Sequence, residues 1–314
     1  MRVGASIPAM AANSTTSTRA PLTVERIVPR LAAAAWAMLP VTAGPALAAG
    51  LDPRSGAVRT TGSVGLWAIW GIALLAHLVP HPLALTAVRV AAPAGVVAAI
   101  LTSVGAHPAS TIQAGLAVAS AVIAALLAFA PAVGERAVNG PAYPNERRFP
   151  LRVPALLVIG PLPLAWALAV GTPVAAAFLL AAQRWIAGAV AAVVGVILAT
   201  LLGRSLHQLS RRWLVFVPAG LVLHDFLTLG QPVLFPRRMI ETLRPAPVDS
   251  DSLDLTQRAL GLALELVLLE KVPMTLQKPG RRWGEEGASA RLLCTPVRPG
   301  RVLQEAALRR IPTA

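Results

Sequence analysis

Long apolar stretches separated by short polar ones fill the first two thirds of the chain, and this pattern ends near residue 204. Each long stretch is close to the roughly 20 residues that a helix needs to cross the hydrocarbon core of a bilayer. These stretches cover about 31–50, 63–80, 83–101, 112–133, 153–170 and 185–203. The apolar segment 171–184 is too short to span and is predicted to lie at the periplasmic interface. The pattern therefore predicts an α-helical polytopic membrane bundle of about six transmembrane helices over residues 26–203.

The first apolar stretch allows two interpretations. Ala46-Leu47-Ala48 resembles a signal-peptidase site, so residues 31–49 could form a cleaved secretory signal. The stretch continues to about Ala49 without a polar segment before that site, which favours a retained helix. Residues 1–25 are rich in Ala, Ser and Thr and show little apolar periodicity, so they are predicted to form a disordered cytoplasmic tail.

Beyond residue 204 the apolar residues come in short groups that are typical of strands. Trp213–Val217 and Leu221–Asp225 flank Pro218-Ala219-Gly220, which indicates a β-hairpin. Leucines alternate with other residues over 260–268 and predict a strand, although Ala, Glu and Leu individually favour helix. Residues 291–295 predict one more strand.

Two further segments complete the prediction for this part of the chain. The polar residues 271–290 predict a turn or a mobile loop. Pro299-Gly300 precedes a segment with Val302, Leu303, Ala306 and Ala307 on one helical face, which predicts a closing helix. Residues 204–314 are therefore expected to form a small cytosolic β-rich domain with a C-terminal helix.

The composition agrees with a membrane protein. Hydrophobic residues make up 55% of the 314 residues and charged residues only 13%, whereas soluble domains carry roughly 25% charged residues. A formal net charge of +14 could indicate nucleic-acid binding, but no basic cluster interleaved with aromatic residues is present, so no nucleic-acid partner is expected. The single cysteine, Cys294, and the absence of a Cys/His pattern predict no disulfide, metal or cofactor.

The arginines orient the predicted bundle. With the N-terminus inside, the outer loops carry only Arg54, Arg59 and Arg184, whereas residues from 204 onward carry 16 Lys and Arg. Inner loops of membrane proteins carry an excess of Lys and Arg. The chain is therefore expected to be a multi-pass protein of the cell (plasma) membrane with both termini cytoplasmic.

Polar residues within the apolar stretches are the first candidate sites. His77, Arg89 and Gln113 are the intramembrane polar candidates, and a polar cavity lined by them would favour a transporter. No Asp or Glu lies inside a predicted span, which disfavours a proton relay. Arg89 could bind an anionic substrate, but its place near the inner boundary favours a side chain that reaches back to the membrane surface.

A second set of candidates consists of arginines expected at the inner membrane surface. They are Arg147, Arg148, Arg204, Arg211, Arg212, Arg237 and Arg238. Each basic residue near an anionic leaflet contributes about 1 kcal/mol of attraction. They are candidate lipid or phosphate contacts, with the anionic inner leaflet as the expected partner. The plainer interpretation is ordinary positive-inside charge.

No catalytic constellation stands out. His224 and Asp225 are adjacent at a strand end and point to opposite faces, so an Asp-initiated turn is the simpler interpretation. Glu265 and Glu270 are predicted to face solvent. The chain contains no nucleophile elbow, P-loop, zinc-protease or dinucleotide motif. An enzyme is therefore not expected.

The stretch RRWLVFVPAGLVLHDFLTLGQPVLFPRR resembles the start of bacterial PH-like domains that follow membrane helices. There a strand leaves the membrane stem, turns and returns toward a strand ending in a Pro-Arg-Arg-type sequence. The resemblance covers about 110 residues and implies a PH-like fold for 204–314. The whole chain also resembles uncharacterised bacterial multi-pass membrane proteins. The expected function is a scaffold, an assembly factor or an inner-leaflet binding module. The alternative is a transporter or lipid-handling component with a substrate path in the bundle.

Overall fold

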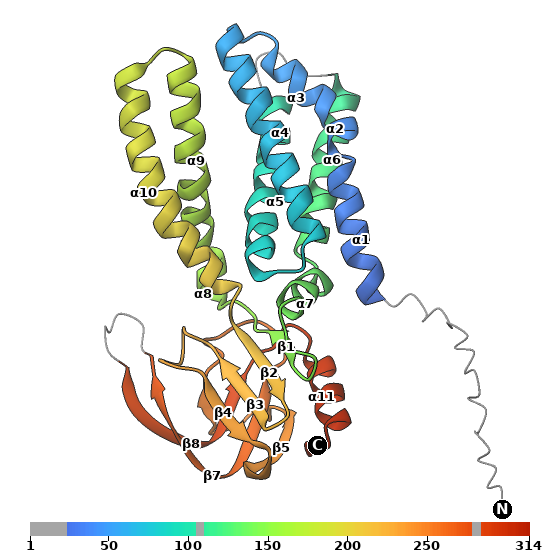
Figure 1. Cartoon of the computed structure of the whole chain (residues 1–314), viewed down its shortest axis with the longest axis vertical. Coiled ribbons are helices and arrows are strands. Elements are labelled where there is room, and N and C mark those ends of the chain that lie inside the picture. The colour runs from blue at the N-terminus through green and yellow to red at the C-terminus, as the bar shows by residue number, and fades with distance from the viewer. Residues whose placement is uncertain (1–23, 105–109, 278–283) are drawn as a thin grey trace, which may run out of the picture.

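The computed structural model describes residues 24–104, 110–277 and 284–314, and it has two parts, one above the other (Figure 1). Long helices form one part, and strands with a final helix form the other. Among the described residues, five helices are long and apolar enough to cross a membrane, namely α4, α5, α6, α9 and α10. This confirms the coarse fold class. The predicted tail lies outside the described residues up to residue 23.

The helical part follows the chain in an up-and-down order. Its helices are α1 Val24–Ala37, α2 Leu39–Thr42, α3 Gly44–Leu51, α4 Gly56–Leu78, α5 Pro82–Ser103, α6 Thr111–Ala128, α7 Pro131–Asn139, α8 Ala155–Ile159, α9 Pro161–Ala181 and α10 Trp185–Leu209. Helix α1 begins at the end that carries the sheet-rich domain, and α10 returns to that same end (Figure 1).

The first apolar stretch is not the single helix that the sequence predicts. It is divided into α1, α2 and α3, which together run from the domain end to the far end of the bundle (Figure 1). Pro40 and Pro45 lie in the first turns of α2 and α3. A proline removes a backbone donor and clashes with the preceding turn, so each one ends the helix before it.

The fifth apolar stretch is also placed differently. Gly160 divides the stretch 153–170 between α8 and α9. Residues 171–184 were predicted to be interfacial, but 171–181 form the second half of α9. The pairing with α10 explains the difference. A Cβ at Gly195 would lie 3.1 Å from the Pro173 nitrogen, so the two backbones approach closely there. Small residues permit such packing between membrane helices.

Alanines form most of the packed surface among α1 to α6. Helix α6 buries Ala117, Ala121, Ala124 and Ala128 along one face. Trp36 and Trp70 are joined by two reciprocal bonds, in which each indole nitrogen donates to the other residue's carbonyl at 3.0 and 3.1 Å. The interior of this bundle is therefore tightly packed and largely apolar.

The sheet-rich part contains two four-stranded sheets in the order β1-β2-β3-β4 and β5-β7-β8-β6. The strands are β1 Arg147–Pro150, β2 Trp213–Val217, β3 Gly220–His224, β4 Val233–Pro236, β5 Ile240–Pro245, β6 Leu253–Asp254, β7 Leu264–Leu276 and β8 Glu285–Cys294. The predicted hairpin is confirmed, because β2 and β3 pair antiparallel around Pro218 and Ala219. A short 3-10 helix, Arg237–Met239, joins β4 to β5.

The second sheet corrects two predictions. Strand β7 begins at Leu264, whereas Leu260 and Leu262 precede it and are exposed. The segment 271–290 was predicted to be a turn or a mobile loop, yet 271–276 belong to β7 and 285–290 to β8, and the two strands pair as far as Leu276 and Glu285. Residues 278–283 lie outside the described residues. Polar residues can occupy a strand when one of its faces meets water. Polar and apolar residues alternate little over 271–290, so the pattern there did not predict a strand.

The core between the sheets collects the strand residues that the sequence marks as apolar. Phe149, Phe216 and Phe235 are all buried there. The predicted closing helix is confirmed as α11, Pro299–Leu308, which buries Val302 and Ala306 against this core.

Candidate functional site at the junction of bundle and domain

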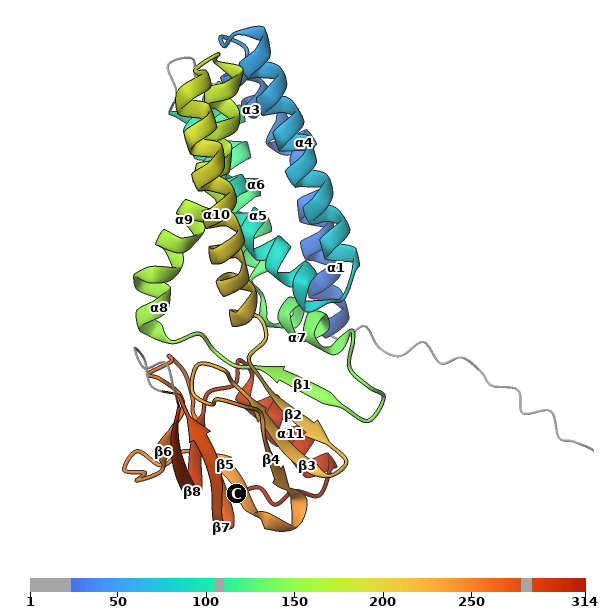
Figure 2. The ribbon, with the colours of Figure 1, turned by 60° about the vertical axis from the view of Figure 1, so that its left-hand side comes forward.

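The segment between α7 and α8 supplies a strand to the C-terminal domain. Strand β1 pairs antiparallel with β2, with Arg147 opposite Phe216 and Phe149 opposite Leu214. On its other side, Val297 N donates to Pro150 O at 2.8 Å. Phe149 is buried in the domain core. A domain boundary at residue 204 therefore omits a strand that is hydrogen-bonded on both sides (Figure 2).

A buried ion pair lies where α10 passes into the domain. Arg212 Nε donates to Asp225 Oδ1 at 2.6 Å, and Arg212 Nη2 donates to Asp225 Oδ2 at 2.7 Å. Arg212 Nη1 donates to Arg152 O at 2.9 Å, so all three guanidinium nitrogens have partners. Both side chains are 1% exposed. This pair joins the end of the last membrane helix to β3 and to the segment after β1.

Asp225 also organises the turn that the sequence predicts. Its Oδ1 accepts a hydrogen bond from Leu227 N at 3.1 Å, and its carbonyl accepts from Leu229 N at 2.8 Å. The predicted Asp-initiated turn is therefore confirmed. His224 points elsewhere, and its ring stacks on Trp213 at a centroid distance of 5.3 Å.

An ion network connects the helical part to the segment before α11. Arg298 Nη1 lies 3.2 Å from Glu135 Oε2 of α7 and 3.5 Å from Glu25 Oε1 of α1. Arg301 of α11 also contacts Glu25. Arg147 lies 3.8 Å from Glu135. Burial raises the pKa of Glu135, and the attraction of Arg298 and Arg147 only partly opposes that effect.

A side-chain clasp fixes α7 against β1. Asn139 Nδ2 donates to Arg148 O at 2.8 Å, and Arg148 N donates to Asn139 Oδ1 at 2.9 Å. Next to this clasp, a Cβ at Gly140 would lie 1.6 Å from Pro80 O. Only glycine permits this approach between the α7 end and the α4–α5 turn.

The stem of α10 is held to α5 by a smaller polar cluster. Thr86 Oγ1 lies 2.9 Å from His207 Nδ1 and 3.2 Å from Ser210 Oγ. On the other side of the bundle, Arg136 of α7 donates to the carbonyls of His77 and Leu78 at 3.2 and 3.3 Å. Both of these polar groups of contacts lie at the end of the bundle nearest the domain.

The predicted surface arginines occupy different environments. Arg212 is fully buried and ion-paired, so it does not face a lipid headgroup. Arg148 is half-buried, bonded to Glu146 at 2.8 Å and placed over Trp213 at 5.3 Å. Arg204 and Arg211 are exposed near the end of α10.

Arg237 and Arg238 lie at the far end of the hairpin. Gly220 pairs with Pro236, so Arg237 follows β4 at the β2–β3 turn, opposite the end where α10 enters β2. The five residues of β2 separate these two ends by roughly 17 Å. Arg237 and Arg238 are therefore separated from Arg204 and Arg211 by the length of the hairpin.

The three intramembrane candidates are not brought together. Gln113 is exposed in the first turn of α6 and lies next to its capping residue, Ser110. Arg89 lies over the Phe129 ring at 5.9 Å, and its Nε has no hydrogen-bond partner. His77 borders a cavity of about 20 Å³, which is room for about one water molecule. Neither Arg89 nor Gln113 lines this cavity.

Glu265 was predicted to face solvent, and this is wrong. It is 1% exposed, and its carboxylate accepts from Arg244 Nε at 2.7 Å, Ser250 Oγ at 2.7 Å and Ser252 Oγ at 2.6 Å. Burial alone would raise its pKa, but the hydrogen bonds from Ser252, Ser250 and Arg244 lower that pKa to about 2. These bonds fasten the β5–β6 loop to β7. Single-sequence periodicity could not show that this position is covered by a loop.

Metal-ligand clusters and the single thiol are two further candidates for chemistry among the described residues. No cluster of three His, Cys, Asp or Glu side chains within 24–104, 110–277 and 284–314 could hold a metal ion. Burial raises the pKa of the Cys294 thiol to about 12, so it is a thiol rather than a thiolate at neutral pH. The contacts at the junction hold the helical part and the sheet-rich part of the chain together.

Comparison of the chain with protein-family models, with curated proteins and with solved structures finds no match.

Proposed function

We propose that this protein is a membrane-anchored platform for protein assembly, with a C-terminal domain held in a fixed position at the inner leaflet. The observation that carries this proposal is the pairing of β1 with β2. Because one strand comes from between two membrane helices, the domain is built from two distant parts of the chain. It cannot swing freely like a domain on a linker.

The packing of the bundle supports a platform over a transporter. Alanine faces fill the space among α1 to α6, and the cavity at His77 is lined by neither Arg89 nor Gln113. The two-sheet order with a closing helix is the outline expected of a PH-like domain, and we include that fold identity in the proposal.

Orientation in the cell membrane is part of the same proposal. The end of the bundle next to the domain carries Arg147, Arg148, Arg204 and Arg211, and inner membrane faces are enriched in such residues. Both termini are then cytoplasmic. A reporter enzyme fused after Ala314 should be active in the cytoplasm. Activity only on the outer side would contradict the orientation. This fusion reports the side of the membrane on which the C-terminus lies, and the platform function has its own test.

The platform is tested by site-specific photo-crosslinking in intact cells. A photoreactive residue replaces one exposed apolar residue at a time, at Leu234, Val248, Leu260 and Leu308, which are 44 to 101% exposed. A platform gives adducts of defined mass at a subset of these positions, and a probe at Ile186, at the opposite end of the bundle, gives none of them. Absence of adducts at all four positions, with the protein present in the membrane, contradicts the proposal.

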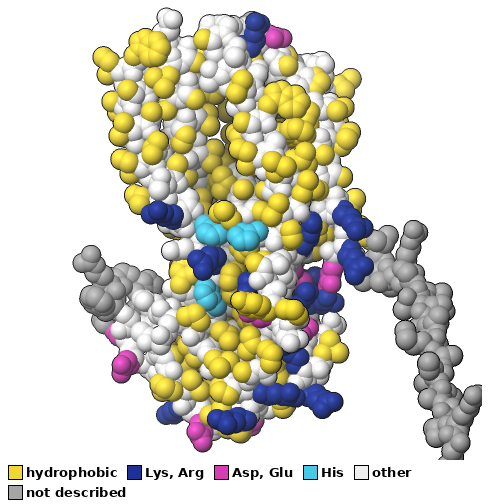
Figure 3. Space-filling view, viewed as in Figure 1, with side chains coloured by type: hydrophobic (Ala, Val, Ile, Leu, Met, Phe, Trp, Pro, Cys, Tyr) yellow, Lys and Arg dark blue, Asp and Glu magenta, His cyan; other side chains and the backbone are white. Residues whose placement is uncertain are grey.

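A lipid-handling role is the second candidate, and one feature favours it. The α9–α10 pair is separated from α4 and α5 by a hollow in the space-filling view (Figure 3). The two sides are joined by the bond from Trp166 Nε1 to Val90 O at 2.9 Å. A lipid acyl chain could enter such an opening from the bilayer. Transfer of labelled lipid between leaflets of proteoliposomes would support this role, and transfer no faster than in protein-free liposomes would exclude it.

A further inference from the structure

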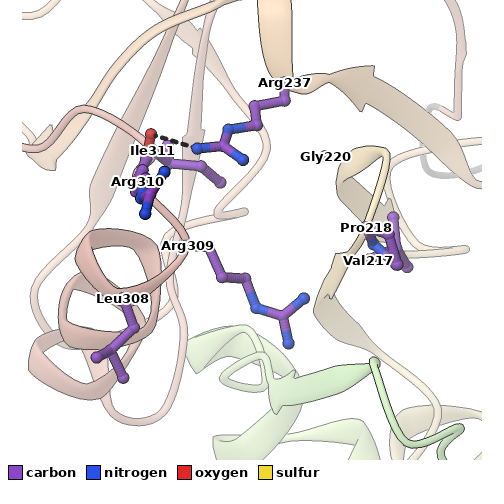
Figure 4. Close-up of a pocket in the computed structure, with 8 residues that line it drawn as sticks. All are labelled: Val217, Pro218, Gly220, Arg237, Leu308, Arg309, Arg310 and Ile311. Carbon is purple, nitrogen blue, oxygen red and sulfur yellow. Dashed lines mark hydrogen bonds between the residues drawn. The ribbon is translucent and has the colours of Figure 1, made fainter.

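A pocket of about 230 Å³ lies between the end of α11 and the β2–β3 turn (Figure 4). The segment that leads into β1 borders it, because Arg309 Nη1 donates to Asn145 O at 3.0 Å. Three arginines line it, namely Arg237, Arg309 and Arg310. Its apolar lining comes from Val217, Leu308 and Ile311. Arg309 and Arg310 follow α11 directly, and their position next to Arg237 is not visible in the sequence.

The cationic groups of this pocket are largely uncompensated. Arg309 Nε donates to Glu305 Oε1 at 2.7 Å, which offsets one charge. Arg237 Nη2 donates to the neutral carbonyl of Arg310 at 3.1 Å. Neither Arg237 nor Arg310 forms an ion pair with an acidic side chain of the described residues. The pocket therefore presents a net positive charge beside an open apolar wall.

The turn that forms one wall is fixed by its backbone. Gly220 has φ +151°, and a Cβ there would lie 2.1 Å from Phe235 O. Arg237 N donates to Ala219 O at 2.9 Å, which ties the turn to the start of the 3-10 helix. On the opposite wall, Leu308 is 80% exposed although it is apolar. The pocket is thus shaped before any ligand binds.

The chain itself offers no acidic segment to fill this pocket. All 14 Asp and Glu residues belong to the described part of the chain, and residues 1–23, 105–109 and 278–283 contain none. The C-terminal segment is held along β5, where Leu243 N donates to Pro312 O at 2.9 Å. An acidic side chain that fills the pocket must therefore come from another molecule.

We propose that this pocket binds an acidic segment of a partner protein, with carboxylates on Arg237 and Arg310 and an apolar side chain beside Leu308. The planar guanidinium group matches a carboxylate with two parallel hydrogen bonds. The exposed apolar side chain of Leu308 beside the arginines favours a segment with both acidic and apolar residues over a phosphate group alone. This inference rests on the platform function, since it identifies where a partner docks and with what chemistry.

The test uses the full-length protein in nanodiscs of neutral lipid and a fluorescent peptide that alternates Glu with Leu. Binding is followed by fluorescence anisotropy. The Arg237→Glu/Arg310→Glu variant should weaken binding about a hundredfold, on the order of tenfold for each reversed charge. The matched control is Arg258→Glu/Arg291→Glu, which reverses two exposed arginines near β6 and β8, and it should bind as the parent protein does.

Three outcomes overturn the inference. They are equal binding by the pocket variant, equal loss in the control variant, and equal binding of a peptide with Gln in place of Glu. Displacement of the acidic peptide by inorganic phosphate or by anionic vesicles would assign the pocket to a phosphate group instead. A circular-dichroism spectrum of the pocket variant that matches the parent shows that loss of binding is not unfolding. If the pocket does not bind the acidic peptide, crosslinked adducts at other positions of the domain would still support the platform function.

Discussion

Arg212 and Asp225 form a fully buried, two-pronged ion pair, with N–O distances of 2.6 and 2.7 Å. Arg212 lies between α10, which ends at Leu209, and β2, and Asp225 directly follows β3. Breaking a buried pair from one side leaves a charge without a partner, which costs more than the pair contributes as a whole. This contact therefore ties the segment between α10 and β2 to the end of β3.

Replacing Arg212 alone should destabilise the domain strongly. Arg212→Met leaves Asp225 buried and unpaired, and we expect a loss of about 3–5 kcal/mol in the free energy of unfolding. Chemical denaturation of the full chain in nanodiscs, followed by tryptophan fluorescence, measures it. Arg212→Met/Asp225→Leu should recover most of the loss, and the exposed neighbour variant Arg211→Gln should show none. A single variant as stable as the parent would contradict the role of this pair.

The C-terminal region should not fold stably without β1. A fragment of residues 207–314 exposes the β2 edge and lacks Phe149, which is buried in the core. We expect a cooperative thermal transition only after residues 145–153 are joined to the fragment, as measured by circular dichroism. Phe149→Ala in the joined fragment should cost about 3–5 kcal/mol. A fragment that melts at the same temperature with and without β1 would show that this strand is dispensable.

The junction should become less stable as the pH rises. The pKa of Glu135 is raised by burial above its usual 4.5, so the folded state favours the protonated carboxyl group. Its contribution is fully present below about pH 4.5 and is lost as the pH rises through the raised pKa. Glu135→Gln should remove this dependence and preserve stability at neutral pH. Denaturation at several pH values compares it with the exposed control Glu241→Gln, which should retain the dependence.

Glu265 should have the opposite effect in acid. Its pKa is lowered to about 2 from 4.5, so its contribution is present above about pH 4.5 and is lost as the pH falls toward 2. Glu265→Gln should cost about 1–3 kcal/mol at neutral pH, because the neutral amide cannot satisfy Arg244 and both serines. Acid unfolding of the variant should then depend less on pH in this window. Glu270→Gln on the exposed part of β7 is the control.

Anionic lipid should be retained by the arginines near the end of α10 rather than by those at the hairpin tip. Arg204→Gln/Arg211→Gln removes two exposed charges, which predicts a loss of up to about 2 kcal/mol of attraction. Mass spectrometry of lipid that copurifies with the protein measures the change, and added salt should reduce it. Arg237→Gln/Arg238→Gln should retain the parental amount of lipid. Equal losses in both variants would show that the attraction is not local.

The sequence by itself determined the features that depend on nearby residues. Apolar length marked α4, α5, α6 and α10, Pro218-Ala219-Gly220 marked the hairpin, and Pro299-Gly300 marked the start of α11. These signals are local because turn chemistry and the length of an apolar run act over a few residues to about twenty.

Only the tertiary structure decided which distant segments meet. Arg147 and Phe216 pair across the whole α8–α10 segment, and nothing local to β1 specifies that partner. The same is true of the charged residues. Arg212 and Glu265 belong to charged residue types that usually lie at the surface. Each is buried because a partner elsewhere in the chain satisfies its charge. The segments that fold over a charged side chain decide whether it faces water. The residues next to it in sequence do not identify those segments.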